Sequence, residues 1–360
     1  MDIPYEQELI EKKRGLAETL GEFGHLLKEL IPSPKPLHYR NKMEFAFGDD
    51  KPGGELSLGI RKRRSMYEVA TVEECALIPN EFREVARVVT DYFQSTGEAF
   101  FHRKKHTGCL RHLTVRLGEF TGEVLVMLSA TSSLTAPLEP LVNELKKTCP
   151  GLVGFLYAVN NGVSDVVKTE DVRVLYGRDW YKESLFGHDF EVAINAFFQT
   201  NSSGAEVLYG IVCDFARECE SNRLAMDLYC GTGTIARIVS QYFDRVVGIE
   251  ITPEAIESAK RMAEKNCEFY AGDVMKLMQD EVFENPDVII LDPPRDGINP
   301  KLIPKLAWLR PEKIIYVSCK PSSLARDIPL LKEHGYVPTI IKAVDMFPRT
   351  PHVEAIVVFM

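Results

Sequence analysis

The sequence predicts an α/β protein with a mostly parallel sheet in its C-terminal part and an α+β region before it. From about residue 190 onward, short apolar runs alternate with segments of helical character, a pattern typical of a parallel sheet covered by helices on both faces. Between residues 38 and 175, apolar and polar residues alternate between turns rich in glycine and aspartate, which favours antiparallel strands. Residues 5–30 instead carry apolar positions at helical spacing, and the prolines within 31–36 end that helix.

These patterns divide the chain into three parts. Residues 1–36 form an N-terminal helix that we expect to pack on the C-terminal domain, residues 37–185 form the central α+β domain, and residues 186–360 form the α/β domain. The central domain has two helical stretches, at 80–95 and 137–148. Seven strands are predicted in the C-terminal domain, of which the last two form an antiparallel edge pair: 225–229, 245–250, 267–273, 287–292, 313–319, 336–347 and 353–360. The helices between them are predicted at 234–243, 253–266, 300–309 and 321–335.

Composition points to a globular protein with a sizeable core. The 360 residues are 45% hydrophobic and 26% charged, and no apolar run reaches the roughly 18 residues that a membrane-spanning helix needs. Residues 1–15 are too charged for a secretory signal, so we expect a cytoplasmic protein without membrane contact. We also expect a monomer. The eight cysteines are irregularly spaced without a CxxC pair, which argues against a disulfide framework or a structural metal site.

The charge is unevenly distributed along the chain. The formal net charge is −9, yet residues 35–116 carry 15 Lys and Arg against 11 Asp and Glu. An acidic body with a basic module is compatible with binding of a nucleic acid.

The segment MDLYCGTGTIA (226–236) has the pattern of a strand, a glycine turn and the start of a helix. Gly231 and Gly233 permit a tight turn and close approach of a ligand, and the helix amines can receive a polar group. Glu250, at the end of the next strand, can accept both ribose hydroxyls of a nucleoside cofactor, and Asp273 can reach an adenine amine. The missing third glycine disfavours a dinucleotide. The alternative is that Glu250 and Asp273 are surface caps.

Polar residues also end the fourth and fifth strands. Asp292 precedes two prolines, Cys319 precedes Lys320 and Pro321, and Glu354 starts the last strand. A strand-end cysteine is core filler, a metal ligand or a nucleophile, and Glu354 is a base or a solvated charge. Because ligands bind at the carboxyl ends of parallel strands, one site is predicted to collect five of these residues. They are Asp227, Glu250, Asp273, Asp292 and Cys319.

Nearly the whole chain resembles one enzyme family, the S-adenosylmethionine-dependent RNA uridine C5-methyltransferases that modify tRNA and rRNA. The motifs FFQTN, DLYCGTGT, GIE, LDPPRDG, SCKPSSLARD and FPRTPHVE occur in the order typical of that family, and LHYRNKMEFAFG and LGIRKRRSMYEV resemble its central RNA-binding domain. The resemblance implies a class I, Rossmann-like methyltransferase domain, S-adenosylmethionine as cofactor and RNA as partner. The substrate would be a uridine in rRNA, with 23S rRNA preferred, or alternatively the T-loop uridine of tRNA.

The resemblance also implies roles for individual residues. Cys319 would be the nucleophile that adds to uracil C6, and Glu354 the base that removes the C5 proton. Phe197 and Phe198 would pack around a flipped uracil. The cofactor-site positions would be Gln199, Tyr229, Gly231, Gly233, Glu250, Asp273 and Asp292, with Gln199 and Asp292 also close to the target base. From the basic clusters of the central domain, taken together with this resemblance, the RNA contacts are predicted at Arg61, Arg63, Arg64, Arg103, Lys104 and Lys105. Arg111 and Arg116 of the same domain are also expected to neutralise phosphates.

The sequence departs from this family in two ways. Many relatives carry an N-terminal barrel module, and many hold an iron–sulfur cluster whose first three cysteines precede the helix that begins here near Tyr5. Only Cys75 matches a cluster ligand, and a cluster needs four, so we expect none in this chain. Two competing hypotheses are a methyltransferase acting on an amino group, which would not need Cys319, and a non-catalytic RNA-binding protein.

Overall fold

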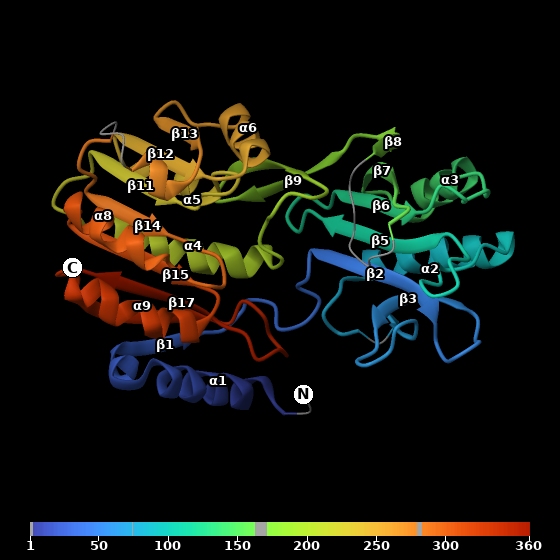
Figure 1. The fold of residues 1–360 in the computed structure, drawn as a ribbon, viewed down its shortest axis with the longest axis horizontal. Coiled ribbons are helices and arrows are strands. Elements are labelled where there is room, and N and C mark those ends of the chain that lie inside the picture. Colours follow the sequence, from blue (N-terminus) through green and yellow to red (C-terminus); the bar gives the residue numbers. More distant parts are fainter. Residues whose placement is uncertain (1–2, 74, 163–170, 279–282) are drawn as a thin grey trace. The chain divides into compact units, whose positions relative to one another are not determined.

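A computed structural model describes residues 3–73, 75–162, 171–278 and 283–360 (Figure 1). The chain forms two compact units. The unit that contains the predicted catalytic residues Cys319 and Glu354, here called the catalytic unit, comprises Met1–Pro36, Leu185–His188 and Phe197–Met360. The central unit comprises Leu37–Ser184 and Asp189–Ala196. In the part of the chain that the structure describes, no helix combines the length and apolar character needed to cross a membrane.

The catalytic unit is built on a mostly parallel sheet of eight strands (Figure 1). Strand β17 runs antiparallel to both of its neighbours, whereas the other paired strands run parallel. In spatial order the strands are β1 (Leu27–Ile31), β16 (Pro338–Val344), β17 (Glu354–Phe359), β15 (Lys313–Ser318), β14 (Val288–Leu291), β11 (Leu224–Leu228), β12 (Arg245–Glu250) and β13 (Cys267–Ala271). The α/β prediction with a mostly parallel sheet is therefore confirmed.

Helices cover the sheet on both faces, as the continuous apolar strands require. One core joins alternate strand residues to α1 (Tyr5–Leu20), α8 (Ile303–Trp308) and α9 (Pro321–Glu333). Met226 of β11 points into this core, so its neighbour Asp227 points to the opposite face, where α5 (Thr234–Val239) donates to it from Ala236. The remaining helical segments are α4 (Ser202–Arg217), α6 (Pro253–Arg261), α7 (Val274–Leu277) and the 3₁₀ turns η1 (Gly21–Leu26), η2 (Ser240–Tyr242) and η3 (Pro300–Leu302).

The N-terminal segment corrects the sequence prediction. The predicted helix over residues 5–30 ends at Leu20, and Leu27–Ile31 forms strand β1 instead. Gly21, at φ +59°, follows the helix, and β1 then pairs in parallel with β16, which lies some 310 residues further along the chain. The sheet consequently has eight strands rather than seven. Strands β16 and β17 pair antiparallel as predicted, but β1 covers β16 and β15 borders β17, so neither is an edge strand.

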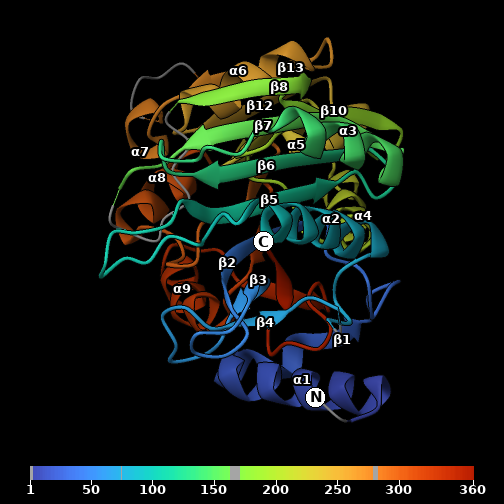
Figure 2. The ribbon, with the colours of Figure 1, turned by 90° about the vertical axis from the view of Figure 1, so that its right-hand side faces the viewer.

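The described residues of the central unit form a seven-stranded sheet and two helices, α2 (Asn80–Thr96) and α3 (Glu139–Thr148), close to the predicted helical stretches (Figure 2). The sheet is antiparallel except that β6 and β7 run parallel, because α3 crosses between them, which the antiparallel prediction missed. In spatial order the strands are β4 (Val69–Thr71), β3 (Leu56–Arg61), β2 (Lys42–Asp49), β5 (Leu110–Leu117), β6 (Val124–Ala130), β7 (Leu152–Val159) and β8 (Val172–Gly177). A two-stranded ribbon of β9 (Trp180–Leu185) and β10 (His188–Ala193) follows.

Candidate active site

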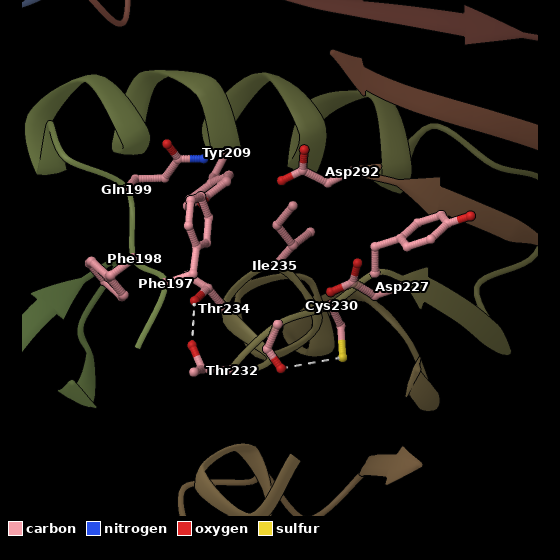
Figure 3. A pocket seen from close by; sticks show the side chains of 12 residues that line it. Phe197, Phe198, Gln199, Tyr209, Asp227, Cys230, Thr232, Thr234, Ile235 and Asp292 are labelled. Carbon is pink, nitrogen blue, oxygen red and sulfur yellow. Dashed lines mark hydrogen bonds between the residues drawn. The ribbon is translucent and has the colours of Figure 1, made fainter. Parts of the chain in front are cut away.

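A pocket lined by both polar and apolar side chains lies at the carboxyl ends of β11 and β14, the edge at which parallel sheets bind ligands (Figure 3). Its lining combines the segment before α4, one residue of α4, one residue of β11, the glycine turn after β11, the start of α5 and the residue that follows β14. The lining residues are Phe197, Phe198, Gln199, Tyr209, Asp227, Tyr229, Cys230, Gly231, Thr232, Thr234, Ile235 and Asp292. Six of the predicted ligand-contacting residues therefore line one pocket: Phe197, Phe198, Gln199, Tyr229, Gly231 and Asp292.

The glycine turn adopts the left-handed backbone conformation at three positions. Tyr229, Gly231 and Gly233 have φ values of +67°, +55° and +77°. A Cβ built on Gly231 would meet no atom within 4 Å, so the turn is open to a ligand there. A Cβ on Gly233 would lie 2.6 Å from the ring of Phe269, so this glycine permits close packing inside the fold. The two glycines that the sequence presents as a pair thus have different surroundings.

Glu250 and Asp273 lie outside the pocket lining and already serve local hydrogen bonds. Glu250 accepts from Gly231 N at 3.3 Å and from Thr252 N at 2.9 Å, so it braces the glycine turn. Asp273 caps α7 by accepting from Met275 N at 2.7 Å. Capping, the alternative interpretation of Asp273, is what its contacts show, whereas Glu250 is tied directly to the pocket wall.

Buried carboxyl groups gather at the pocket. Asp227 is fully buried, its Oδ2 accepts from Ala236 N at 2.9 Å, and its Oδ1 has no hydrogen-bond partner among the described residues. Burial and the nearby Asp292 raise the pKa of Asp227 well above its ordinary value. Burial raises the pKa of Asp292 to about 7, although part of this residue still faces solvent. A ligand that brings positive charge would relieve this concentration of acid groups.

Cys319 and Glu354 meet at neighbouring strand ends. Ser318 closes β15 opposite Ala355 of the antiparallel strand β17, so the next residue on each side, Cys319 and Glu354, brings a thiol and a carboxyl to the same edge of the sheet. Burial raises the pKa of the Cys319 thiol, and Glu354 and Asp292 add to this shift. Burial and Asp292 raise the pKa of Glu354 well above its ordinary value. The predicted nucleophile, the predicted base and Asp292 thus form one electrostatic cluster.

Helix α9, which begins two residues after Cys319, holds the loop that follows Asp292. Ser323 Oγ donates to Arg295 O at 2.7 Å, and Ile298 N donates to the buried Asp327 at 2.9 Å. Gly297, at φ +78°, leaves no room for a Cβ, which would lie 2.4 Å from Asp327 Oδ2. The loop is therefore fixed, and the positive charge of Arg295 opposes the raised pKa of both Cys319 and Glu354.

Comparisons with known proteins agree with this geometry. Residues 220–336 match the model of a methyltransferase domain. An uncharacterized RNA methyltransferase of Clostridium tetani is 42% identical, and the alignment covers 99% of this chain and 80% of that protein. One of Caldanaerobacter subterraneus is 40% identical over the same shares. This chain belongs to the RNA methyltransferase family. The resemblance drawn from its motifs, and the cofactor class that it implies, are therefore confirmed.

A solved structure is similar to this RNA methyltransferase over nearly its whole chain. The tRNA (uracil-54, C5)-methyltransferase of Pyrococcus abyssi, crystallised with S-adenosylhomocysteine, matches with a TM-score of 0.82 and 28% identity. The match covers 99% of this chain and 84% of that one. The class I methyltransferase fold is thus shown both by sequence and by structure.

The residues of the pocket fit S-adenosylmethionine. The unpartnered Asp227 Oδ1 and the raised pKa of Asp292 call for a ligand with hydrogen-bond donors and positive charge, which an ammonium and a sulfonium group supply. The open side of Gly231 admits close approach of such a ligand. Within the described residues, no group of three or more His, Cys, Asp and Glu side chains is arranged to hold a metal ion.

Five of the six predicted RNA contacts lie on two loops of the central unit, and the sixth, Arg61, is the last residue of β3 before the first of these loops. Tyr67 joins these loops, because its ring stacks on His102 with centroids 4.2 Å apart and its hydroxyl accepts from Lys104 N at 3.4 Å. Arg61 is half-buried and donates to Met66 O at 2.6 Å, so it also shapes its loop. The exposed members are Arg63, Arg64, Lys104 and Lys105, and Arg103 is half-buried.

The expectation that Arg111 and Arg116 neutralise phosphates is wrong. Both side chains are buried on β5 and donate to backbone carbonyl groups, Arg111 to Asn160 O and Arg116 to Ile194 O.

Several pocket residues escaped the sequence analysis. Tyr209 lies on α4, a helix that the analysis did not predict, and it is buried within reach of Asp292 and Gln199. The signal was present in Asn201, which caps α4 by accepting from Gly204 N at 2.9 Å, followed by apolar residues at helical spacing. Cys230, Thr232, Thr234 and Ile235 belong to the quoted glycine-turn motif but were given no role.

Proposed function

We propose that this RNA methyltransferase transfers a methyl group to C5 of an RNA uridine through a covalent bond between Cys319 and C6, and that Glu354 removes the C5 proton. The observation that carries the proposal is the placement of a half-buried thiol and a buried carboxyl on adjacent strand ends beside the cofactor pocket. A methyltransferase acting on an amino group has no use for that thiol.

The cofactor would be held by Tyr229 and Gly231 of the glycine turn and by Gln199, with Asp227 and Asp292 facing its positive charges. S-adenosylmethionine, when bound, supplies an electrophilic methyl group, which C5 takes as the methyl–sulfur bond breaks and neutral S-adenosylhomocysteine is left. Glu250, which accepts a hydrogen bond from Gly231 N, would support the glycine turn from outside the pocket lining. Asp273, which follows β13, would lie next to the adenine.

The reaction balances with the chain's own groups. The Cys319 thiol first loses its proton to solvent, and the thiolate then attacks C6, so the C5–C6 π pair moves onto C5 and the O4 carbonyl. After C5 has gained the methyl group, the Glu354 carboxylate takes the C5 proton. The electrons of that C–H bond restore the C5–C6 double bond, and the C6–S bond breaks to return the thiolate. One proton is released in the overall reaction.

The raised pKa values of Cys319 and Glu354 suit this order of events. A thiol with a raised pKa is mostly protonated in the free enzyme, so it has to be deprotonated before attack. A raised pKa means that the Glu354 carboxylate binds a proton more tightly, and Glu354 has to be ionised before it can take the C5 proton. Phe197, whose residue surface is 74% exposed, and the buried Phe198 would contact the flipped uracil.

The RNA remains a choice between two classes. Uridine in 23S rRNA is the substrate that we propose from the sequence. The likeness to a tRNA (uracil-54, C5)-methyltransferase favours tRNA as the second candidate. In both cases the two basic loops of the central unit would neutralise phosphates.

One experiment separates these possibilities. The purified protein is incubated with S-adenosylmethionine and total RNA from a strain lacking the modification, and nucleosides from separated 23S rRNA and tRNA are analysed by mass spectrometry. 5-Methyluridine in one fraction, absent with Cys319→Ala, is the expected result. Methylation of another atom, or methylation that survives Cys319→Ala, supports the amino-group hypothesis. Failure to bind S-adenosylmethionine supports the non-catalytic hypothesis.

A further inference from the structure

Two buried carboxylates join helix α1 to the loop between β16 and β17, here called the base loop (Asp345–Val353). Lys12 Nζ lies 2.7 Å from Asp345 Oδ1 and 2.8 Å from Glu8 Oε1, and it donates to Phe347 O at 3.2 Å. The side chains of Glu8 and Asp345 are 2% and 0% exposed. A single lysine of α1 thus holds the beginning of the base loop through two groups.

Glu8 holds the middle of the base loop. It accepts from Arg349 N at 2.7 Å and lies 3.4 Å from the Arg349 guanidinium, which also donates to Ile3 O at 2.7 Å. Arg349 has a φ of +65°, a conformation that a Cβ disfavours and that persists where the surroundings impose it. The N-terminal segment therefore contacts both the backbone and the side chain of this left-handed residue.

Asn201 holds the same loop from the side of α4. Its Nδ2 donates to Met346 O at 2.9 Å and to Ser33 Oγ at 3.1 Å, and it is fully buried. Ser33 N in turn donates to Tyr5 Oη at 2.9 Å. The start of the base loop is thereby fixed between α4, the segment after β1 and α1.

The base loop leads directly into Glu354. Strand β16 ends at Val344, strand β17 begins at Glu354, and these two residues are register partners. Apolar packing of Leu16, Leu20 and Phe23 already attaches the N-terminal segment to the core. Buried salt bridges contribute little net stability, and this network contacts the base loop at Asp345, Phe347 and Arg349. The main effect of the network is therefore on the base loop, because apolar packing already attaches helix α1 to the core.

We propose that Glu8, Lys12 and Arg349 are positioning residues, which fix the base loop so that the Glu354 carboxylate is aimed at the C5 proton. This inference rests on the proposed function, since it assigns the network to the last step of that reaction. Loosening the loop would slow proton removal while leaving the attack of Cys319 on C6 intact. The enzyme would then stay covalently attached to a methylated uridine.

The test uses Glu8→Gln, with Glu11→Gln as the matched control on the exposed side of the same helix. Turnover on uridine RNA is expected to fall about 10- to 100-fold in Glu8→Gln, as for a slightly misplaced catalytic group, and to stay unchanged in Glu11→Gln. The distinguishing readout is a denaturation-resistant protein–RNA band on uridine RNA, expected for Glu8→Gln and for the reference variant Glu354→Gln but not for wild type.

Two further measurements keep the result interpretable. S-adenosylhomocysteine affinity and the melting temperature identify a variant that has lost its fold. In that case Arg349→Lys, which retains the charge but removes the guanidinium that contacts both Glu8 and Ile3 O, replaces Glu8→Gln. A folded variant with reduced turnover and no covalent band overturns the inference, and so does wild-type turnover. If Glu354→Gln itself gives no covalent band, the proposed function fails rather than the positioning role.

Discussion

The two units differ in the burial of their charged side chains. In the catalytic unit, Asp227, Asp292 and Glu354 are gathered in a buried cluster whose pKa values rise. In the central unit, Arg63, Lys104 and their neighbours stand exposed on loops joined by one aromatic stack. Burial amplifies electrostatic effects, whereas water and salt screen exposed charges. Substitutions in the catalytic unit should therefore have large effects on chemistry and stability, and those in the basic loops small effects on affinity.

The largest expected effect of a charge change is at the base. Glu354→Gln removes the proton acceptor, so turnover should fall about 10²- to 10⁴-fold, the contribution typical of a general base. Steady-state methyl transfer to uridine RNA measures this loss. The control is Glu29→Gln, which should retain full turnover. Glu29 is a partly exposed residue of the edge strand β1, and it forms a salt bridge with Lys342 of β16. Equal turnover of the two variants would remove the contrast between buried and exposed carboxylates.

Asp292 should make stability depend on pH. Its pKa is about 7 in the folded protein against an ordinary value of 3.8, so between these values the folded state keeps a proton that the unfolded state has lost. Stability consequently falls as pH rises from about 4 to 7. The loss amounts to roughly 2–4 kcal/mol, the full linkage value being reduced because Asp292 is partly exposed.

Urea denaturation at pH 5 and pH 8 checks this sign. Asp292→Asn cannot ionise, so it should stabilise the protein relative to wild type more at pH 8 than at pH 5. The exposed Asp296, in the same loop, provides the control Asp296→Asn. A pH-independent difference for Asp292→Asn would contradict the assigned pKa.

The variant Asp327→Ala tests whether a buried carboxylate of the catalytic unit stabilises the loop that follows Asp292. Asp327 accepts from Tyr316 Oη at 2.8 Å and from Ile298 N at 2.9 Å, and Asp327→Ala leaves both donors without this partner. The free energy of unfolding should fall by about 1–3 kcal/mol for each donor left unsatisfied, as urea denaturation measures. Unchanged stability would mean that the loop after Asp292 is not held by α9.

The smallest effects are expected in the basic loops. Arg63→Gln or Lys104→Gln should weaken RNA binding a few-fold, with an equal effect on different sequences, and should reduce the slope of log affinity against log salt by about 0.7–0.9 per phosphate contact. Filter binding at several salt concentrations measures both quantities. The control is Arg87→Gln, at an exposed arginine paired with Asp91 on α2. A slope unchanged from this control would remove these loops from the RNA interface.

Sequence reasoning predicted the elements that repeat locally. The strands of the α/β region lie where the sequence has apolar runs. Asp292, Cys319 and Glu354 lie close together because β14, β15 and β17 are neighbours and place these residues at one edge of the sheet. Asp273 lies after a strand as predicted and also caps α7, so its position alone does not distinguish a cofactor contact from a helix cap.

Long-range pairing escaped prediction. Leu27–Ile31 has the apolar content of either a helix or a strand, and its partner β16 decides the outcome. The contact of Glu8 with Arg349 joins residues 341 positions apart, and no local pattern signals it. Gly231 and Gly233 look equivalent in the motif, and only the ring of Phe269 distinguishes them.

The most direct test of the central claim is adduct formation with RNA carrying 5-fluorouridine. Fluorine at C5 cannot be removed as a cation, so the C6–S bond should persist after methyl transfer. The account predicts an equimolar covalent complex that needs S-adenosylmethionine, maps to the Cys319 peptide by mass spectrometry and is absent with Cys319→Ala. A wild-type enzyme that methylates uridine RNA but forms no such complex would contradict the covalent mechanism.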